Sequence, residues 1–299
     1  MESQNKNEIN TSGTEKLYKA FIYVVLIALC FSIIVPVGWV FLASIKQDSE
    51  FYGNPWSLPL GIHYQNFISA FEKAKMGDYF MNSVITTAVA LLVLLVVALP
   101  AAYVLARCDF KANKFFNGLF MAGLFINVNY IVVPIFLMLV DGDKVAQNYL
   151  GNGIFLNNIF VLAIVYASTA LPFTIYLLSG YFKTLPKAYE EAAYVDGCGY
   201  FKTMVRIIMP MARPSIITVI LFNFLSFWNE YIIALTLMTD DSAKTLPVGI
   251  MNLMTAQNAA AQYGQMYAGL VIVMLPTLIL YIAVQKRLTQ GMSMGGLKG

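Results

Sequence analysis

The sequence contains several long stretches without a charged residue, and these restrict its fold more than any other feature. Ala20–Ile45 and Phe115–Val140 are uncharged over 26 residues each, and Tyr79–Ala106 over 28. About 20 apolar residues suffice to cross the hydrocarbon core of a bilayer. Because that core offers no water to backbone polar groups, a crossing segment must bond them internally, as a helix does. We therefore expect these stretches to be transmembrane helices.

Three further stretches extend the prediction to six transmembrane helices. Val145–Phe182 and Thr245–Gln285 are uncharged, with polar ends and one apolar span each, and Pro214–Thr239 contains the single charge of Glu230. Charged residues make up only 12% of the chain, whereas a soluble domain carries about 25%. A transmembrane barrel would instead show alternating segments of about 10 residues. The sequence thus predicts an all-α membrane protein.

The distribution of lysine and arginine predicts the orientation of these helices. If both ends of the chain lie inside, the inner segments hold 14 of these residues and the outer loops hold 5, which follows the positive-inside rule. We expect a tail at 1–17, a membrane domain at 18–286 with a cytoplasmic loop at 183–213, and a second tail at 287–299, both tails being cytoplasmic. The first apolar run lacks a small-residue cleavage site, which favours a retained anchor. Orientation accounts for the net charge of +3, so no nucleic-acid partner is expected.

The residues that most often form reactive or metal centres show no such pattern. Cys30, Cys108 and Cys198 are odd in number and irregularly spaced, which favours packing roles over a disulfide framework. His63 has no second ligand at a suitable spacing, so no metal site is expected. The chain also lacks the G-x-x-x-x-G-K-[ST] phosphate loop. We therefore expect no ATP hydrolysis by this chain alone.

A charged segment, Lys187–Pro214, interrupts the apolar sequence and is predicted to form two short helices. Pro186 suits a first helical turn, and Ala188, Ala192 and Val195 recur at the spacing of one helix face. Lys187 and Glu191 are placed to pair, and Asp196-Gly197 is expected to end the helix. The second helix would carry Phe201, Met204, Val205 and Ile208 on one side and Lys202 and Arg206 on the other, and would end at Pro210 and Pro214.

Such a helical hairpin could bind lipid headgroups or a protein. Basic amphipathic helices commonly lie at membrane surfaces. However, Glu190, Glu191 and Asp196 are acidic, whereas an anionic leaflet attracts basic residues. The small pair Ala192-Ala193 also suits close contact with another protein. These residues favour a protein partner.

The spacing of this segment resembles a known signature. Glu191-Ala192-Ala193 is followed after three residues by Gly197, then after nine by Ile207 and after one more by Met209-Pro210. This pattern is similar to the EAA signature of binding-protein-dependent ABC importer permeases, with Met209 where leucine is usual. Other segments resemble the smaller maltose-type carbohydrate permease subunit: Asn82-Ser83, Ala101–Tyr103, Ala106-Arg107, Leu171–Phe173, Phe227–Glu230, Thr245–Gly249 and Gly291–Ser293.

The resemblance implies a type I ABC importer permease fold and a non-catalytic transport subunit in the bacterial cell membrane. Such a subunit forms half of a translocation path for a sugar, here expected to be a di- or oligosaccharide. Its implied partners are a second permease subunit, a dimeric cytoplasmic ATPase that binds ATP and Mg, an extracytoplasmic substrate-binding protein and membrane lipid. The chain itself is expected to bind no cofactor.

The resemblance also implies that the EAA helix docks in a cleft of the ATPase. Glu191 would then be the main polar contact and Gly197 the hinge between the short helices. The implied coupling residues are Glu190, Glu191, Ala192, Ala193, Tyr194, Asp196, Gly197, Phe201, Met204, Ile207 and Pro210. The tail at Gly295–Gly299 would either reach between the two ATPases or be a flexible end.

Polar residues within the predicted spans are candidates for the substrate path. They are Asn127, Asn129, Tyr130, Asn223, Trp228, Asn229 and Glu230. A carboxylate within a membrane is costly and often functional. The alternative is that these groups hydrogen-bond between helices and hold the bundle together, with the partner subunit supplying most of the sugar site.

Two other classes of function are considered. A permease of the same fold could carry a non-sugar solute such as an amino acid, a polyamine or phosphate. A membrane-embedded enzyme would need converging nucleophilic and acid–base groups within the spans. Only Glu230 is charged there, so the enzyme class is excluded.

Overall fold

The computed structural model describes residues 13–295 except 53, 73–74 and 261, and all regular secondary structure in this part of the chain is helical. Of the predicted tails, 1–17 and 287–299, residues 1–12 and 296–299 lie outside the described residues, whereas 13–17 and 287–295 are helical. The longer helices are α1 (Gly13–Ser44), α3 (Met76–Arg107), α5 (Val128–Leu150), α6 (Ile159–Thr184), α10 (Arg213–Trp228), α12 (Leu246–Ala260) and α13 (Tyr263–Gly295). The shorter elements are η1 (Asp48–Phe51), α2 (Gln65–Glu72), α4 (Asn113–Gly123), α7 (Ala188–Val195), α8 (Tyr200–Thr203), η2 (Met204–Ile208), α9 (Met209–Met211), α11 (Ile232–Leu237) and η3 (Asp241–Ala243).

Four described helices are long and apolar enough to cross a membrane, and two bent helix pairs raise the number to six if each pair is one span. The four lie in α1, α3, α6 and α13. One pair is α4 with α5, bent by 100°, and the other is Tyr200–Met211 with α10, bent by 78°. The predicted class is therefore confirmed as all-helical, with four to six candidate spans.

The predicted third span is not one straight helix, and its residues explain the bend. At the end of α4, a side chain on Gly123 would come within 2.8 Å of Pro172 of α6, so glycine permits the close approach. The Asn127 side chain accepts a hydrogen bond from the Asn129 amide at 2.9 Å and caps the start of α5. An N-cap residue begins a new helix because it bonds an amide that has no intrahelical partner.

The core of the bundle is the contact between α3 and α6, which pack along much of their length. Small buried side chains lie on both helices, including Ala90, Ala98 and Ala102 of α3 and Ala163 and Ala167 of α6. Such residues let helix backbones approach closely in membranes. Larger buried residues such as Leu94, Leu162, Tyr166 and Leu178 fill the remaining space.

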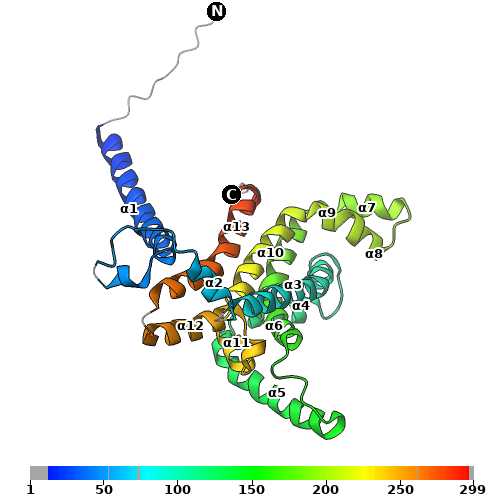
Figure 1. Cartoon of the computed structure of the whole chain (residues 1–299). Coiled ribbons are helices and arrows are strands. Elements are labelled where there is room, and N and C mark those ends of the chain that lie inside the picture. The colour runs from blue at the N-terminus through cyan, green and yellow to red at the C-terminus, as the bar shows by residue number, and fades with distance from the viewer. Residues whose placement is uncertain (1–12, 53, 73–74, 261, 296–299) are drawn as a thin grey trace, which may run out of the picture.

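Helix α1 projects from this bundle and contacts it mainly through α13 (Figure 1). None of its most apolar 18-residue window is buried. A helix that is apolar on all sides suits a lipid environment. The start of α1, the end of α13 and α7 lie toward the upper side of Figure 1, whereas α5 and α11 lie toward the lower side.

Candidate functional site

The predicted coupling segment begins with α7, whose end has a well-defined cap. The Gly197 amide donates to the Tyr194 carbonyl at 3.0 Å and the Cys198 amide donates to the Ala193 carbonyl at 2.8 Å. This pair of bonds is the Schellman motif, which needs a left-handed residue. Gly197 supplies it with a φ of 75°. The prediction that Asp196-Gly197 ends the first helix is confirmed.

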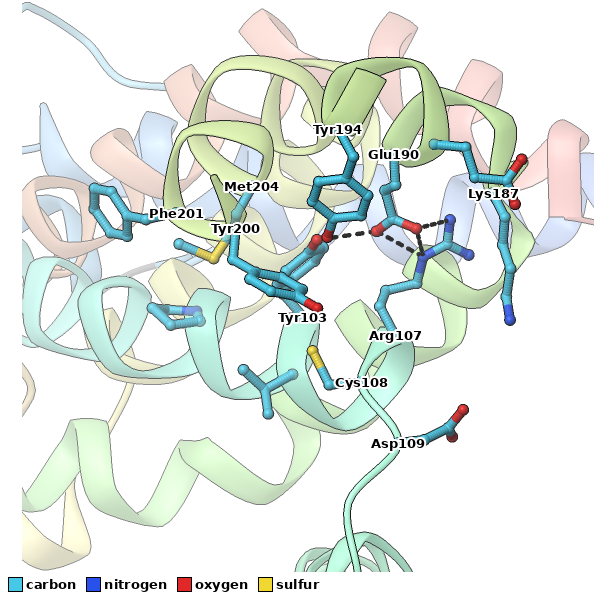
Figure 2. A pocket seen from close by; sticks show the side chains of 13 residues that line it. Tyr103, Arg107, Cys108, Asp109, Lys187, Glu190, Tyr194, Tyr200, Phe201 and Met204 are labelled. Carbon is cyan, nitrogen blue, oxygen red and sulfur yellow. Dashed lines mark hydrogen bonds and ion pairs between the residues drawn. The ribbon is translucent and has the colours of Figure 1, made fainter. Parts of the chain in front are cut away.

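The inward face of α7 is fixed to the end of α3 by an ion pair. Arg107 Nε donates to both carboxylate oxygens of Glu190 at 3.1 Å, and Nη2 lies 2.8 Å from Oε2. The Tyr103 hydroxyl donates to the same carboxylate at 3.0 Å, and Arg107 Nη1 donates to the Leu185 carbonyl at 2.9 Å. Figure 2 shows Arg107 and Tyr103 converging on Glu190. One guanidinium thus holds α3, α7 and the segment that follows α6.

Burial makes this pair energetically important. Glu190 is only 9% exposed, and the Arg107 side chain only 4%. Removing one member of a buried pair leaves an uncompensated charge, which typically costs about 3–5 kcal/mol. The position of α7 therefore depends on both residues.

Sequence reasoning did not find the partner of Glu190. Adjacent helix positions point about 100° apart, so Glu190 and Glu191 cannot both face the same way. This angle was the only indication in the sequence that one of the two glutamates faces inward. Arg107 is 83 residues away, and only packing shows that it is the partner. The predicted pair of Lys187 with Glu191 was wrong for the described residues: both are exposed, and the ion pair forms at Glu190 instead.

The outward face of α7 is open in this chain. Ala188, Glu191, Ala192 and Val195 are exposed at helical spacing, Val195 by 88%. Ala193 is buried on the opposite face. The three residues predicted to share one face do so, and Glu191 lies among them. This small, largely apolar surface with one carboxylate can accept a closely fitting protein.

The second helix differs from its prediction. It ends at Met211, between Pro210 and Pro214 as predicted, but it includes the π-helical segment η2. Met204 and Ile208 are buried as expected, but Phe201 is 74% exposed and Val205 is also exposed. Thr203 is buried on this helix in their place, and the π-helical segment changes the residue spacing only from Met204 onward.

A groove of about 670 Å³ separates α7 and α8 from the end of α3. The rings of Tyr194 and Tyr200 meet edge to face at its wall, with centroids 5.2 Å apart. Partial burial raises the pKa of the Tyr194 hydroxyl and of the Cys108 thiol, which keeps both groups neutral. The lining residues are Pro100, Tyr103, Val104, Arg107, Cys108, Asp109, Lys187, Glu190, Glu191, Tyr194, Tyr200, Phe201 and Met204. In the described part of the chain no cluster of ligands could hold a metal ion.

The remaining predicted coupling residues lie around this unit. Asp196 and Pro210 are exposed, and Ile207 packs on the core at half burial.

The predicted substrate-path residues of the third span lie at the start of α5. Asn127 and Asn129 are exposed, and Tyr130 is exposed as well. Asn127 uses its side-chain oxygen to cap the helix.

The predicted substrate-path residues of the fifth span mostly bond within the bundle. Asn223 is buried and donates to Thr174 Oγ1 at 3.0 Å, and the buried Trp228 donates through Nε1 to the Val273 carbonyl at 3.2 Å. Asn229 is exposed and donates to the Leu225 carbonyl at 2.8 Å. These bonds agree with the alternative that polar groups hold the helices together.

Glu230 occupies the break between α10 and α11. Its carboxylate accepts hydrogen bonds from the Tyr166 hydroxyl at 2.8 Å and from the amides of Ile233 at 2.7 Å and Ala234 at 3.0 Å. A carboxylate at a helix N-terminus is favourable because it bonds free amides and opposes the helix dipole. Glu230 therefore begins α11 and ties it to α6.

Comparison with known proteins gives a family match over most of the chain. Residues 98–294 match the family model described as "Binding-protein-dependent transport system inner membrane component". In this family the membrane component binds no cofactor and is separate from the ATPase.

Several curated proteins are similar over nearly the whole length. The permease protein of a diacetylchitobiose uptake system, NgcG of Streptomyces coelicolor, is 33% identical over 95% of this chain and 90% of its own. The melibiose/raffinose/stachyose import permease protein MelC of Bacillus subtilis is 30% identical over 89% and 91%. The trehalose/maltose permease protein MalG of Thermococcus litoralis is 28% identical over 88% and 91%.

A solved structure shares the fold. It is a chain of a bacterial ABC transporter involved in the import of the acidic polysaccharide alginate, with a TM-score of 0.77 and 22% identity over 92% of this chain and 98% of the other. This likeness agrees with the predicted type of permease fold.

Proposed function

This chain belongs to the family of binding-protein-dependent transport system inner membrane components, and we propose that the solute it helps to import is a di- or oligosaccharide. The relatives named above are permease proteins for diacetylchitobiose, for melibiose, raffinose and stachyose, and for trehalose and maltose. These cargoes share the chemistry of short sugar chains, which supports the same class here. The specific sugar would be chosen by the extracytoplasmic binding protein.

The coupling mechanism in this proposal rests on one observation, the exposed face of α7. Ala188, Ala192 and Val195 form a surface with little side-chain bulk, and Glu191 stands on it. An ATPase cleft with a basic residue could close on this surface and pair with Glu191, and such desolvated charge pairs add specificity. Gly197 would let α7 and α8 keep their sharp relative angle during the movement.

The proposed assembly contains a second permease subunit, two ATPase subunits that bind ATP and Mg, and the binding protein. ATP binding would favour the closed ATPase pair and so bias the membrane helices between two states. The placement of the start of α1, the end of α13 and α7 on one side in Figure 1 supports a common cytoplasmic location for them. Asn127, Asn129 and Tyr130 would face the path or the second subunit, because their exposed positions leave them available.

The test is ATP-driven uptake in proteoliposomes that contain this chain with its partner subunits and binding protein. Labelled di- and oligosaccharides would be compared with amino acids, a polyamine and phosphate. We expect saturable uptake of at least one sugar and none of the other solutes. Uptake of a non-sugar solute alone would contradict the proposed cargo and identify the other class of permease.

A further inference from the structure

The contact between α7 and α3 lies beside a groove. The groove of about 670 Å³ lies between α7, α8 and the end of α3, so apolar packing does not fill this space. The buried Arg107–Glu190 pair lies at its wall, with three nitrogen–oxygen distances of 2.8 to 3.1 Å. Arg107 Nε donates to both carboxylate oxygens, and charge-assisted hydrogen bonds of this kind fix orientation as well as distance. The pair is thus a directed link between the two helices at the edge of the groove.

The opposite end of α3 also makes directed polar contacts. Asn82 donates through Nδ2 to the carbonyls of Ser242 at 2.9 Å and Lys244 at 3.0 Å. Ser83 Oγ accepts a hydrogen bond from the Leu246 amide at 2.7 Å in a buried position. The outer segment 240–246 is therefore fastened to the start of α3, as α7 is fastened to its end.

These two contact points are joined by one helix. From Ser83 to Arg107 there are 24 helical steps, which span about 36 Å at 1.5 Å each. Pro100 lies within this stretch and removes one backbone hydrogen bond. The helix nevertheless continues to Arg107, so its remaining hydrogen bonds can carry axial or tilting movement over this length. Small residues along the contact of α3 with α6 give a smooth surface for a shift.

We propose that the Arg107–Glu190 pair is a strut that transmits displacement of α7 into α3 and, through Asn82 and Ser83, to the outer segment 240–246. Arg107 and Glu190 are positioning residues in this role, because they act through α3 and do not touch solute. The inference rests on the ATPase docking proposed for α7, and it names the route by which docking changes the outer side. Tyr103 supports the strut by donating to the Glu190 carboxylate.

The test uses the full transporter complex with a reporter on the outer segment. Cys30, Cys108 and Cys198 are replaced by serine, and Ser242→Cys places one thiol on an exposed residue of that segment. The rate of maleimide labelling is measured with and without ATP. Glu190→Gln then removes the charge while it keeps the shape of the side chain. Lys202→Gln, an exposed single-charge change on the neighbouring helix, is the matched control.

We expect ATP to change the labelling rate in the parent and in Lys202→Gln. In Glu190→Gln the ATPase still co-purifies, because the outward face is intact, but the ATP-dependent change falls by about fivefold or more. Arg107→Lys should give an intermediate loss, since lysine keeps a charge but cannot form the two-pronged contact.

Three results would overturn the strut. The first is an unchanged ATP-dependent labelling response in Glu190→Gln, and the second is no such response in the parent. The third is loss of the ATPase from the Glu190→Gln complex, which would mean that the pair only maintains the shape of the docking face. The proposed docking is tested separately with Glu191→Lys. If the ATPase co-purifies normally with this variant, the docking proposal itself is wrong.

Discussion

Arg107 and Glu190 form a two-pronged ion pair between the end of α3 and the inward face of α7, with Nη2 2.8 Å from Oε2 and Nε 3.1 Å from both carboxylate oxygens. The pair determines which of two adjacent glutamates is available to a partner. Because Glu190 is held inward, Glu191 points outward beside Ala192 and Val195.

The two glutamates should differ in their effect on stability. Glu190→Ala leaves the Arg107 charge buried without its partner, so we expect a loss of about 3–5 kcal/mol. Glu191→Ala removes an exposed side chain and should change stability by no more than about 0.5 kcal/mol. Thermal unfolding of the purified protein in detergent compares them. Equal effects of the two substitutions would contradict the inward placement of Glu190.

Adding a side chain at Gly197 should lower stability only because the backbone there is left-handed. Its φ is 75° and a Cβ would meet no atom within 4 Å, so Gly197→Ala tests conformation without a steric clash. We expect a loss of about 1–2 kcal/mol, the cost of a left-handed non-glycine residue. Gly199 has a φ of −76° and equal open space, so Gly199→Ala is the matched control and should be neutral. A neutral Gly197→Ala would show that the turn is not needed.

Gly249 permits the close contact of α12 with α3. A Cβ there would lie less than 3 Å from the Tyr79 ring, so Gly249→Ala should cost about 1–3 kcal/mol through overpacking. Combining it with Tyr79→Ala, which makes room, should give less than the sum of the two losses. Gly180 of α6 faces open space, and Gly180→Ala should not destabilise. Strict additivity in the double variant would argue against the contact.

The segment after α1 should be sensitive to acid. Glu50 accepts hydrogen bonds from the amides of Gln47 and Leu60, each at 2.9 Å, and these bonds lower the pKa of its carboxyl group below the ordinary 4.5. A lowered pKa means that the stabilisation is fully present above about pH 4.5 and is lost as the pH falls through the lower folded value. Tryptophan fluorescence should report the change, because Trp56 packs on Trp39 in this region. In Glu50→Gln this acid transition should disappear, and its persistence would assign it to another group.

The sequence predicted the membrane helices and the exposed face of α7, but it did not predict the bends in the helices or the buried face of the second short helix. Uncharged stretches predict membrane helices because burial of charge in lipid is costly, and that prediction holds. The bends do not follow from hydropathy, since they depend on the contact of Gly123 with Pro172 and on the cap at Asn127. Periodicity predicted the face of α7, because an eight-residue α-helix keeps a regular spacing. It was wrong for Val205, which lies in the π-helical segment Met204–Ile208, and for Phe201, which precedes that segment and whose exposure has no explanation in the spacing.

For the polar residues of the fifth span, the sequence likewise identified the residues but not their partners. The sequence identified Asn223, Trp228 and Glu230 as candidates for the substrate path, with hydrogen bonding between helices as the alternative. Only tertiary packing shows that they bond to Thr174, Val273 and Tyr166.

The most direct test of the account is ATP-driven sugar uptake by the reconstituted transporter with a blocked α7 face. Ala192→Trp places a large side chain on the exposed docking surface, and Lys202→Gln is the control outside it. The account predicts that Ala192→Trp lowers uptake by about tenfold or more, because a close protein contact tolerates little added volume, and that Lys202→Gln transports normally. Uptake by Ala192→Trp equal to that of the wild type would contradict the central claim that α7 couples the ATPase to transport.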